Sequence, residues 1–189
     1  MKRRKASKFL KRKSMLSLFL VIGGVLMLGG IFLIVENQFQ PDSVDDLINP
    51  PRVGESMSDF TLIDVEGNQV SLRYFEGRPV LINAWATWCP PCRAEMPDLN
   101  AYYQAHQEEG FMILAVNAGE SQKEVTQFTE HVDLDFPVLM DPGNGLLNEL
   151  RVFSFPTSIL VGRDGLVKAI HIGLFTPEMM EEEITPHLK

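Results

Sequence analysis

An apolar segment that leads straight into a pair of cysteines limits the possible folds of this sequence more than any other feature. Residues 79–86 (PVLINAWA) form a short, mostly apolar run that is typical of a β-strand buried on both faces. After two intervening residues, Thr87 and Trp88, comes Cys89-Pro90-Pro91-Cys92. From there to about Gln107, apolar residues recur with helical spacing on one face, at positions 92, 96, 99 and 103. The sequence therefore predicts a buried strand, a turn that contains the cysteines and a helix in direct succession.

The rest of the folded part alternates between strand patterns and helix patterns. A hairpin is predicted first, with strands at 60–64 and 69–72 around Glu66-Gly67-Asn68. Further strands are predicted at 111–117, 136–140, 157–161 and 166–172. Helices are predicted from the capping box Ser121-x-x-Glu124 to about His131, over 146–152, and from Thr176-Pro177 to a point before Pro186. This order is typical of an α/β domain with a mixed central sheet flanked by helices.

Residues 15–35 form a run of 21 residues without a charged side chain. An apolar helix of about 20 residues spans the hydrocarbon core of a bilayer, and no small-residue cleavage site follows the run. Eight lysines and arginines precede it, whereas Glu36 and three aspartates follow it closely. The excess of positive charge predicts a cytoplasmic N-terminus. We therefore expect an uncleaved signal-anchor, a single-pass protein of the cell membrane, and an extracytoplasmic domain.

These segments divide the chain into four predicted parts. Residues 1–14 are a basic cytoplasmic tail, 15–35 the transmembrane anchor, 36–52 a linker with three prolines, and 53–189 the folded domain. Residues 14–189 carry nine lysines and arginines against 25 acidic residues. A domain as acidic as this is repelled by phosphate backbones, which argues against nucleic acid as a partner.

Cys89 and Cys92 are the only cysteines of the sequence. A disulfide between them would close a very short loop and remove little chain entropy, so it would be a poor structural staple. A structural zinc site usually needs four Cys or His ligands, but the four histidines are scattered and form no H-x₃₋₅-H pair. A redox-active pair is therefore favoured, and no metal or cofactor is expected.

The predicted placement gives the two cysteines different roles. Cys89 would lie at the N-terminal edge of the helix, where unpaired N–H groups and the helix dipole favour the thiolate that attacks a disulfide. Cys92, one turn inside, would be more buried and would act as the resolving thiol. Pro90 and Pro91 have no N–H to offer the Cys89 sulfur, so later amides such as that of Cys92 must stabilise it. Weaker stabilisation of the reduced form favours a reductase over a strong oxidant.

Several separated segments resemble one known family. The segment LINAWATWCPPCRAEMP resembles the active-site region of the thioredoxin superfamily, and specifically of its membrane-anchored TlpA/ResA-like thiol–disulfide oxidoreductases. Pro97 matches the proline that kinks the active-site helix of thioredoxins, and Phe155-Pro156-Thr157 matches their cis-proline loop. DFTLIDVEGNQVSL is similar to the family's leading hairpin. The resemblance covers about residues 53–188 and implies a thioredoxin-like fold and protein-disulfide reductase activity.

The resemblance implies a catalytic group made of Cys89, Cys92 and Glu95, with the two cysteines as the redox-active disulfide. Glu95 lies three residues after Cys92 and matches an acidic residue of the ResA-like branch, so it would relay the proton of the resolving thiol. The sequence departs from thioredoxin itself at Asn83, where thioredoxin has a buried acid. Asparagine takes up no proton at neutral pH, which leaves Glu95 as the candidate for proton transfer.

Substrate binding is assigned to Trp88, Phe155 and Pro156. Pro156 is expected to be cis, which is a low-cost state for an X–Pro bond, and would place a backbone edge beside Cys89 for an extended substrate. Trp88 would shield the site. The resemblance implies oxidised envelope proteins as substrates, with apocytochrome c during cytochrome c biogenesis among them, and a membrane thiol-transfer protein of the DsbD/CcdA kind as the reductant.

Two other functions of the same fold stay open. A peroxiredoxin shares the hairpin-led fold, but its peroxidatic cysteine usually has Thr or Ser three residues earlier, where this chain has Ala86. A copper-binding assembly factor typically separates its two cysteines by three residues and adds a distant histidine. The spacing here is two, and His171 is the only plausible distant ligand.

Overall fold

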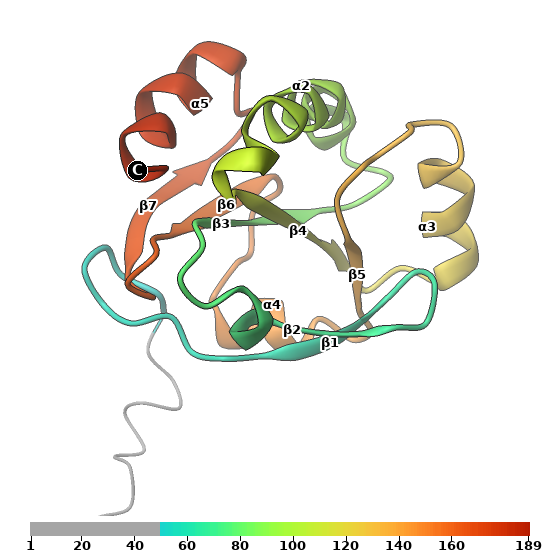
Figure 1. Cartoon of the computed structure of the whole chain (residues 1–189). Helices are drawn as coiled ribbons and strands as arrows, with labels where there is room; N and C mark the ends of the chain where they lie inside the picture. Colours follow the sequence, from blue (N-terminus) through green and yellow to red (C-terminus); the bar gives the residue numbers. More distant parts are fainter. Residues whose placement is uncertain (1–49) are drawn as a thin grey trace, which may run out of the picture. The chain divides into compact units, whose positions relative to one another are not determined.

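A seven-stranded sheet with helices on both faces makes up the part of the chain that the computed structural model describes, residues 50–189 (Figure 1). The strand order is β2-β1-β5-β4-β3-β6-β7. The pairs β3–β4 and β4–β5 are parallel, whereas the other neighbouring pairs are antiparallel. The predicted α/β class with a mixed central sheet is therefore confirmed.

The elements lie close to their predicted positions. The strands are β1 (Thr61–Asp64), β2 (Gln69–Ser71), β3 (Val80–Trp85), β4 (Met112–Ala118), β5 (Val138–Asp141), β6 (Thr157–Val161) and β7 (Val167–Ile172). The α-helices are α2 (Pro90–His106), α3 (Gln122–Thr129), α4 (Gly145–Glu149) and α5 (Pro177–Glu183). Three short 3₁₀ helices are η1 (Leu72–Phe75), η2 (Gln107–Glu109) and η3 (Thr185–His187).

Strand β3 lies between β4 and β6 in the middle of the sheet, and all six of its residues are buried. Its parallel partner β4 is also buried along its whole length. Burial on both faces explains why these strands read as continuous apolar runs rather than as alternating patterns. Strand β3 therefore runs through the core, and the cysteine segment that follows it lies at one end of the sheet.

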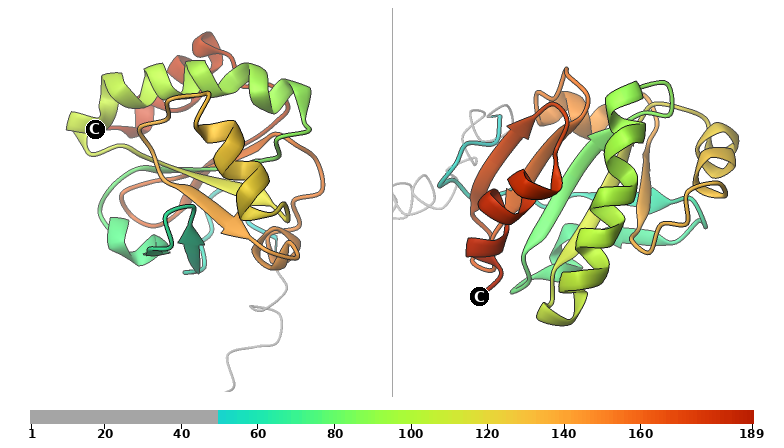
Figure 2. Two further views of the ribbon diagram at one scale, coloured as in Figure 1. Left: turned by 90° about the vertical axis from the view of Figure 1, so that its right-hand side faces the viewer. Right: turned by 90° about the horizontal axis from the view of Figure 1, so that it is seen from above.

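Helices α2, α3 and α5 cover one face of the sheet, and α4 lies on the opposite face (Figures 1 and 2). The crossovers β3-α2-β4 and β4-α3-β5 step in the same direction along the sheet. Because such parallel crossovers are right-handed, they place α2 and α3 on the same face. Helix α2 thus packs over the central strands with its N-terminus at the end of β3.

The buried face of α2 includes the four predicted residues, and it is wider than predicted. Cys92, Met96, Leu99 and Tyr103 are buried, and Glu95 and Tyr102 are buried beside them. The helix starts with Pro90 and Pro91, positions at which a missing N–H breaks no intrahelical bond. Pro97 lies inside the helix.

Two helices end earlier than predicted. The capping box of Ser121 and Glu124 is present, but α3 ends at Thr129. Helix α4 ends at Glu149, because Arg151 adopts a left-handed φ of 55° and the Val152 amide donates to Leu147 O. This is the geometry of a Schellman ending, which usually contains glycine. The sequence did not predict this helix end, because arginine seldom occupies the left-handed position that ends a helix.

The predicted tail, anchor and nearly all of the linker lie outside the described residues. Within residues 50–189, no helix combines the length and the apolar character that a membrane crossing requires. The transmembrane segment at 15–35 accordingly stays a prediction.

Candidate active site

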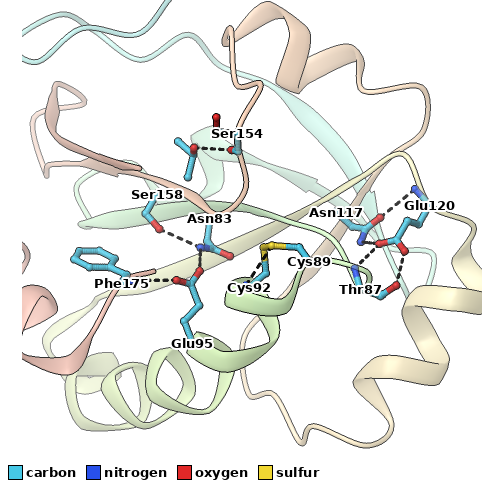
Figure 3. Close-up of a disulfide and its surroundings, with 11 residues drawn as sticks. Asn83, Thr87, Cys89, Cys92, Glu95, Asn117, Glu120, Ser154, Ser158 and Phe175 are labelled. Atoms are coloured by element: carbon cyan, nitrogen blue, oxygen red, sulfur yellow. Dashed lines mark hydrogen bonds between the residues drawn. A yellow bond between two sulfur atoms is a disulfide. The ribbon is translucent and has the colours of Figure 1, made fainter. Parts of the chain in front are cut away.

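Cys89 and Cys92 form a disulfide at the N-terminus of α2, directly after strand β3 (Figure 3). The S–S distance is 2.10 Å. Cys89 is the N-cap residue, and its Sγ accepts a hydrogen bond from the Cys92 amide at 3.3 Å. The sulfur of Cys89 therefore occupies the place where side-chain oxygens usually cap a helix. Pro90 and Pro91 have no N–H, so the Cys92 amide is the first-turn donor to this sulfur, and the helix dipole also favours negative charge there.

The two cysteines differ in exposure in the predicted order. The exposed fraction is 3% for Cys89 and zero for Cys92. Cys89 is nevertheless more enclosed in this disulfide form than expected for a residue that attacks a substrate. Trp88 beside it is 65% exposed, and its ring packs edge-on against Phe155 with the ring centroids 6.0 Å apart.

The loop that contains Pro156 lies next to the end of β3. The Phe155–Pro156 peptide bond is cis, as predicted. Thr157 pairs with Ala84 of β3, which places the preceding proline at the same end of the sheet as the cysteines. Pro156 O accepts a hydrogen bond from the Gly173 amide at 2.9 Å. The structure therefore brings Trp88, Phe155 and Pro156 together around one end of the sheet.

Glu95 is fully buried, one helical turn after Cys92. Its Oε1 accepts a hydrogen bond from Asn83 Nδ2 at 2.9 Å, and its Oε2 accepts one from the Phe175 amide at 2.8 Å (Figure 3). Burial away from water raises the pKa of Glu95 from 4.5 to about 7, even though these two hydrogen bonds and the nearby His171 favour the ionised form. Glu95 is thus suited to gain and lose a proton near neutral pH.

Asn83 acts in this network as a donor. Its Nδ2 binds Glu95 Oε1 and also Ser158 Oγ, at 3.0 Å, and the residue is fully buried. A buried amide holds the carboxylate in place without taking up a proton itself. Glu95 is therefore the residue of this buried cluster that can bind and release a proton.

Sequence reasoning missed a second carboxylate near the cysteines. Glu120, after β4, accepts hydrogen bonds from the Thr87 amide at 2.7 Å, from the Thr87 hydroxyl and from Asn117 Nδ2 at 2.7 Å. The sequence signal was only that Glu120 follows the second predicted buried strand. In the structure β4 pairs in parallel with β3, which brings Asn117 beside Trp85 and so joins the ends of the two strands. Glu120 therefore fixes the segment that leads into Cys89 (Figure 3).

The two residues flanking the cysteine segment have packing roles. Trp85 is fully buried, and its ring lies 5.1 Å from that of Phe128. The guanidinium of Arg93 lies 5.9 Å from the centre of the same Phe128 ring, a cation–π distance, while its side chain stays exposed.

The geometry does not favour the two alternative functions. Both ring nitrogens of His171 already contact protein acceptors, Glu183 Oε1 at 3.1 Å and Leu174 O at 3.2 Å. Across residues 50–189, no group of three or more His, Cys, Asp or Glu side chains is arranged to hold a metal ion. The hydroxyl that usually precedes the cysteine of a peroxiredoxin by three residues is missing at Ala86, and that of the adjacent Thr87 is bound to Glu120.

Comparisons with known proteins agree with this geometry. The AhpC/TSA family matches residues 53–170. The ResA thiol-disulfide oxidoreductase of Halalkalibacterium halodurans is 38% identical over 131 residues, which cover 69% of this chain and 74% of the relative. The ResA of Geobacillus thermodenitrificans is 40% identical over 137 residues, which cover 72% and 76% of the two chains.

Solved structures with the same fold include proteins of thiol–disulfide exchange. A putative thiol:disulfide interchange protein DsbE from Chlorobium tepidum superimposes with a TM-score of 0.69 at 30% identity, covering 74% of this chain and 99% of its own. StoA from Bacillus subtilis superimposes with a TM-score of 0.59 at 29% identity, covering 66% and 95%. The chain therefore belongs to the AhpC/TSA family of the thioredoxin superfamily and is a thiol–disulfide oxidoreductase related to ResA.

Proposed function

We propose that this protein is a membrane-anchored reductase of protein disulfides that works outside the cytoplasm. The observation that carries the proposal is the Cys89–Cys92 pair at the start of α2, with the Cys92 amide directed at the Cys89 sulfur. Only thiolates attack disulfides, and this position favours a thiolate at Cys89.

In the proposed reaction, the Cys89 thiolate attacks one sulfur of a substrate disulfide. A mixed disulfide forms, and the other substrate sulfur leaves as a thiolate that takes a proton from water. The Cys92 thiol then loses its proton and attacks the Cys89 sulfur, which releases the second substrate thiolate. Two electrons pass to the substrate, and the Cys89–Cys92 disulfide is left behind.

Glu95 is the proposed base for the second step. Its ionised carboxylate would accept the proton of the Cys92 thiol, directly or through one water molecule. The arrangement that supports this role is the fixed carboxylate one turn along the same helix, with a pKa of about 7. A base with that pKa is present in both protonation states at neutral pH, so it can pass the proton on after each turnover.

The substrate is proposed to lie against Trp88, Phe155 and Pro156. The exposed Trp88 ring offers apolar surface. Pro156 has no N–H and its carbonyl oxygen is bound to the Gly173 amide, so the backbone of the preceding Phe155 is the edge proposed to pair with an extended chain beside Cys89. Because Cys89 itself is only 3% exposed, we expect disulfides in unfolded or extended segments to reach it more easily than disulfides buried in folded proteins. Apocytochrome c, whose haem-attachment cysteines lie in such a segment, is the substrate we propose first.

The direction of the reaction rests on the two prolines between the cysteines. Pro90 and Pro91 offer no N–H to the Cys89 sulfur, so its thiolate receives less stabilisation than in a strong oxidant. A protein-disulfide reductase outside the cytoplasm needs electrons from across the membrane. A membrane thiol-transfer protein of the DsbD/CcdA kind is the proposed donor, and the uncharged run at 15–35 is the proposed anchor that keeps the two together.

Trapping of the mixed disulfide tests this proposal. Full-length Cys92→Ala should retain substrate proteins covalently, whereas Cys89→Ala should retain none, and the bound proteins are identified after release with a reductant. Equilibration of the full-length protein with glutathione should give a potential more reducing than that of glutathione. Equal trapping by both variants would contradict the assigned roles, and a markedly oxidising potential would contradict the direction.

A further inference from the structure

His171, near the end of β7, contacts the segment whose Phe175 amide donates a hydrogen bond to Glu95. Its Nδ1 lies 3.1 Å from Glu183 Oε1 on α5, and its Nε2 lies 3.2 Å from Leu174 O. Its ring stacks on the ring of Phe175, with the centroids 4.4 Å apart and the planes 8° from parallel. The histidine therefore contacts two residues, Leu174 and Phe175, of the short segment that joins β7 to α5.

The hydrogen-bond partners determine what His171 can do. A carbonyl oxygen only accepts, so the contact with Leu174 O requires a proton on Nε2. A carboxylate oxygen likewise accepts, so Nδ1 donates to Glu183 when that nitrogen carries the proton. The two contacts together fix the orientation of the ring between β7 and α5.

The segment held by His171 includes one of the two donors to Glu95. The Phe175 amide donates to Glu95 Oε2 at 2.8 Å, and Phe175 itself is 2% exposed (Figure 3). The charge of His171 also acts on Glu95 directly, because a nearby positive charge favours the carboxylate over the neutral acid. The groups that face the Glu95 carboxyl are thus Asn83 from β3, the Phe175 amide, and His171 from β7.

We propose that His171 is a positioning residue for proton transfer: it fixes the Phe175 amide against Glu95 and, with its charge, keeps the carboxylate ionised often enough to accept the Cys92 proton. Glu183 holds the ring in the orientation that serves both contacts. The inference rests on the proposed role of Glu95. It adds that His171 on β7 and Glu183 on α5, both outside helix α2, determine the pH midpoint of the resolving step.

Substitutions of His171 should shift the pH midpoint of the resolving step, rather than lower the rate of this step at every pH. In His171→Leu both contacts and the charge are lost, and in His171→Gln a donor to Leu174 O is kept without the charge. We expect the midpoint of the resolving step to rise by about half a pH unit or more in both variants. The rate lost at pH 7 should return at higher pH, whereas a purely structural defect would lower the rate at every pH. His131→Gln, two residues beyond the end of α3, is the matched control and should leave the midpoint unchanged.

The experiment uses the full-length protein and two readouts. Stopped-flow release of thiol from a preformed mixed disulfide gives the resolving rate against pH, and carbon-13 NMR of labelled glutamate carboxyls follows the Glu95 titration directly. If the Cys92→Ala protein traps no mixed disulfide, the proposed function itself fails. If the wild type shows an inflection near pH 7 that Glu95→Gln abolishes, but both His171 variants keep the wild-type midpoint in both readouts, only the role of His171 is refuted.

Discussion

The side-chain amide of Asn83 and the carboxylate of Glu95 meet at 2.9 Å in the interior of the protein, one from the central strand β3 and the other from helix α2. The contact joins the strand that leads into the cysteines to the helix that follows them. Because the amide can only donate to a carboxylate here, the pair holds an ionisable group in place while leaving it free to titrate.

The first prediction concerns the pH dependence of stability. Burial raises the pKa of Glu95 to about 7, whereas in the unfolded chain the group ionises near 4.5. Between these values the folded state binds a proton that the unfolded state has lost, so the free energy of unfolding falls as the pH rises through this window. The total decrease from this one group should reach up to about 3 kcal/mol. Denaturant titrations of the oxidised protein from pH 4 to 8 measure it.

Glu95→Gln isolates the contribution of this group, since glutamine does not titrate. The difference in free energy of unfolding between wild type and variant should change with pH between about 4.5 and 7 and be constant above that window. Glu124→Gln, at the exposed start of α3, is the control that removes a carboxylate elsewhere. A difference that stays flat across the window would show that Glu95 titrates at an ordinary pH.

The second prediction separates the two thiols of the reduced protein. Cys89 caps the helix and keeps a small exposed fraction, whereas Cys92 keeps none. Iodoacetamide at pH 7 should therefore alkylate Cys89 at least about ten times faster than Cys92, because both access and thiolate character favour the first cysteine. Mass spectrometry of peptides after timed quenching measures the ratio. Comparable rates, or a Cys89 that does not react at all, would contradict the assignment of the attacking thiol.

The third prediction concerns the carboxylate that fixes the segment before Cys89. Glu120 accepts hydrogen bonds from the amide and the hydroxyl of Thr87. Glu120→Ala leaves these donors without their partner and should lower the free energy of unfolding by about 1–3 kcal/mol. It should also slow the attack of Cys89 on a small disulfide, because the loop that positions the sulfur is no longer held.

Glu130→Ala at the end of α3 is the control for loss of an acidic side chain. Thermal unfolding and the rate with a small-molecule disulfide are the measurements. An unchanged rate together with the expected loss of stability would restrict Glu120 to a structural role.

Most of the fold follows from local patterns in the sequence. The continuous apolar runs of β3 and β4 indicated central strands, and the Ser121–Glu124 capping box and Thr176-Pro177 indicated the starts of α3 and α5. The end of α4 did not follow, because Arg151 adopts a left-handed conformation that sequence patterns assign to glycine or asparagine. Such exceptions are stabilised by the surrounding fold and leave no local signal.

The candidate site was predictable where its residues are close in sequence. Cys89, Cys92 and Glu95 are ordered by one helix, so their spacing alone placed them together. The environment of Glu95 was not predictable, because its partners come from β3 and from the segment after β7, 12 and 80 residues away. Its complete burial, and hence its pKa near 7, depends on this tertiary packing.

The last prediction tests whether an amide is required at position 83. In Asn83→Asp, two carboxyl groups face each other across the 2.9 Å contact, and the donors to Glu95 Oε1 and to Ser158 Oγ are lost unless the new group is protonated. Like charges this close do not ionise together, so the pair should hold at least one proton well above pH 7.

At pH 5 the protonated aspartic acid can donate to Glu95, and the Asn83→Asp variant should be close to wild type in stability. At pH 8 it should be less stable by about 2 kcal/mol, because the folded pair still has to hold a proton that the unfolded chain has lost. Denaturant titrations at the two pH values will measure the difference. Asn83→Leu removes the same donors without adding charge, so its loss should vary less between the two pH values. If the aspartate variant lost the same stability at pH 5 and pH 8, the two side chains would not be coupled, and the amide at this position would serve packing alone.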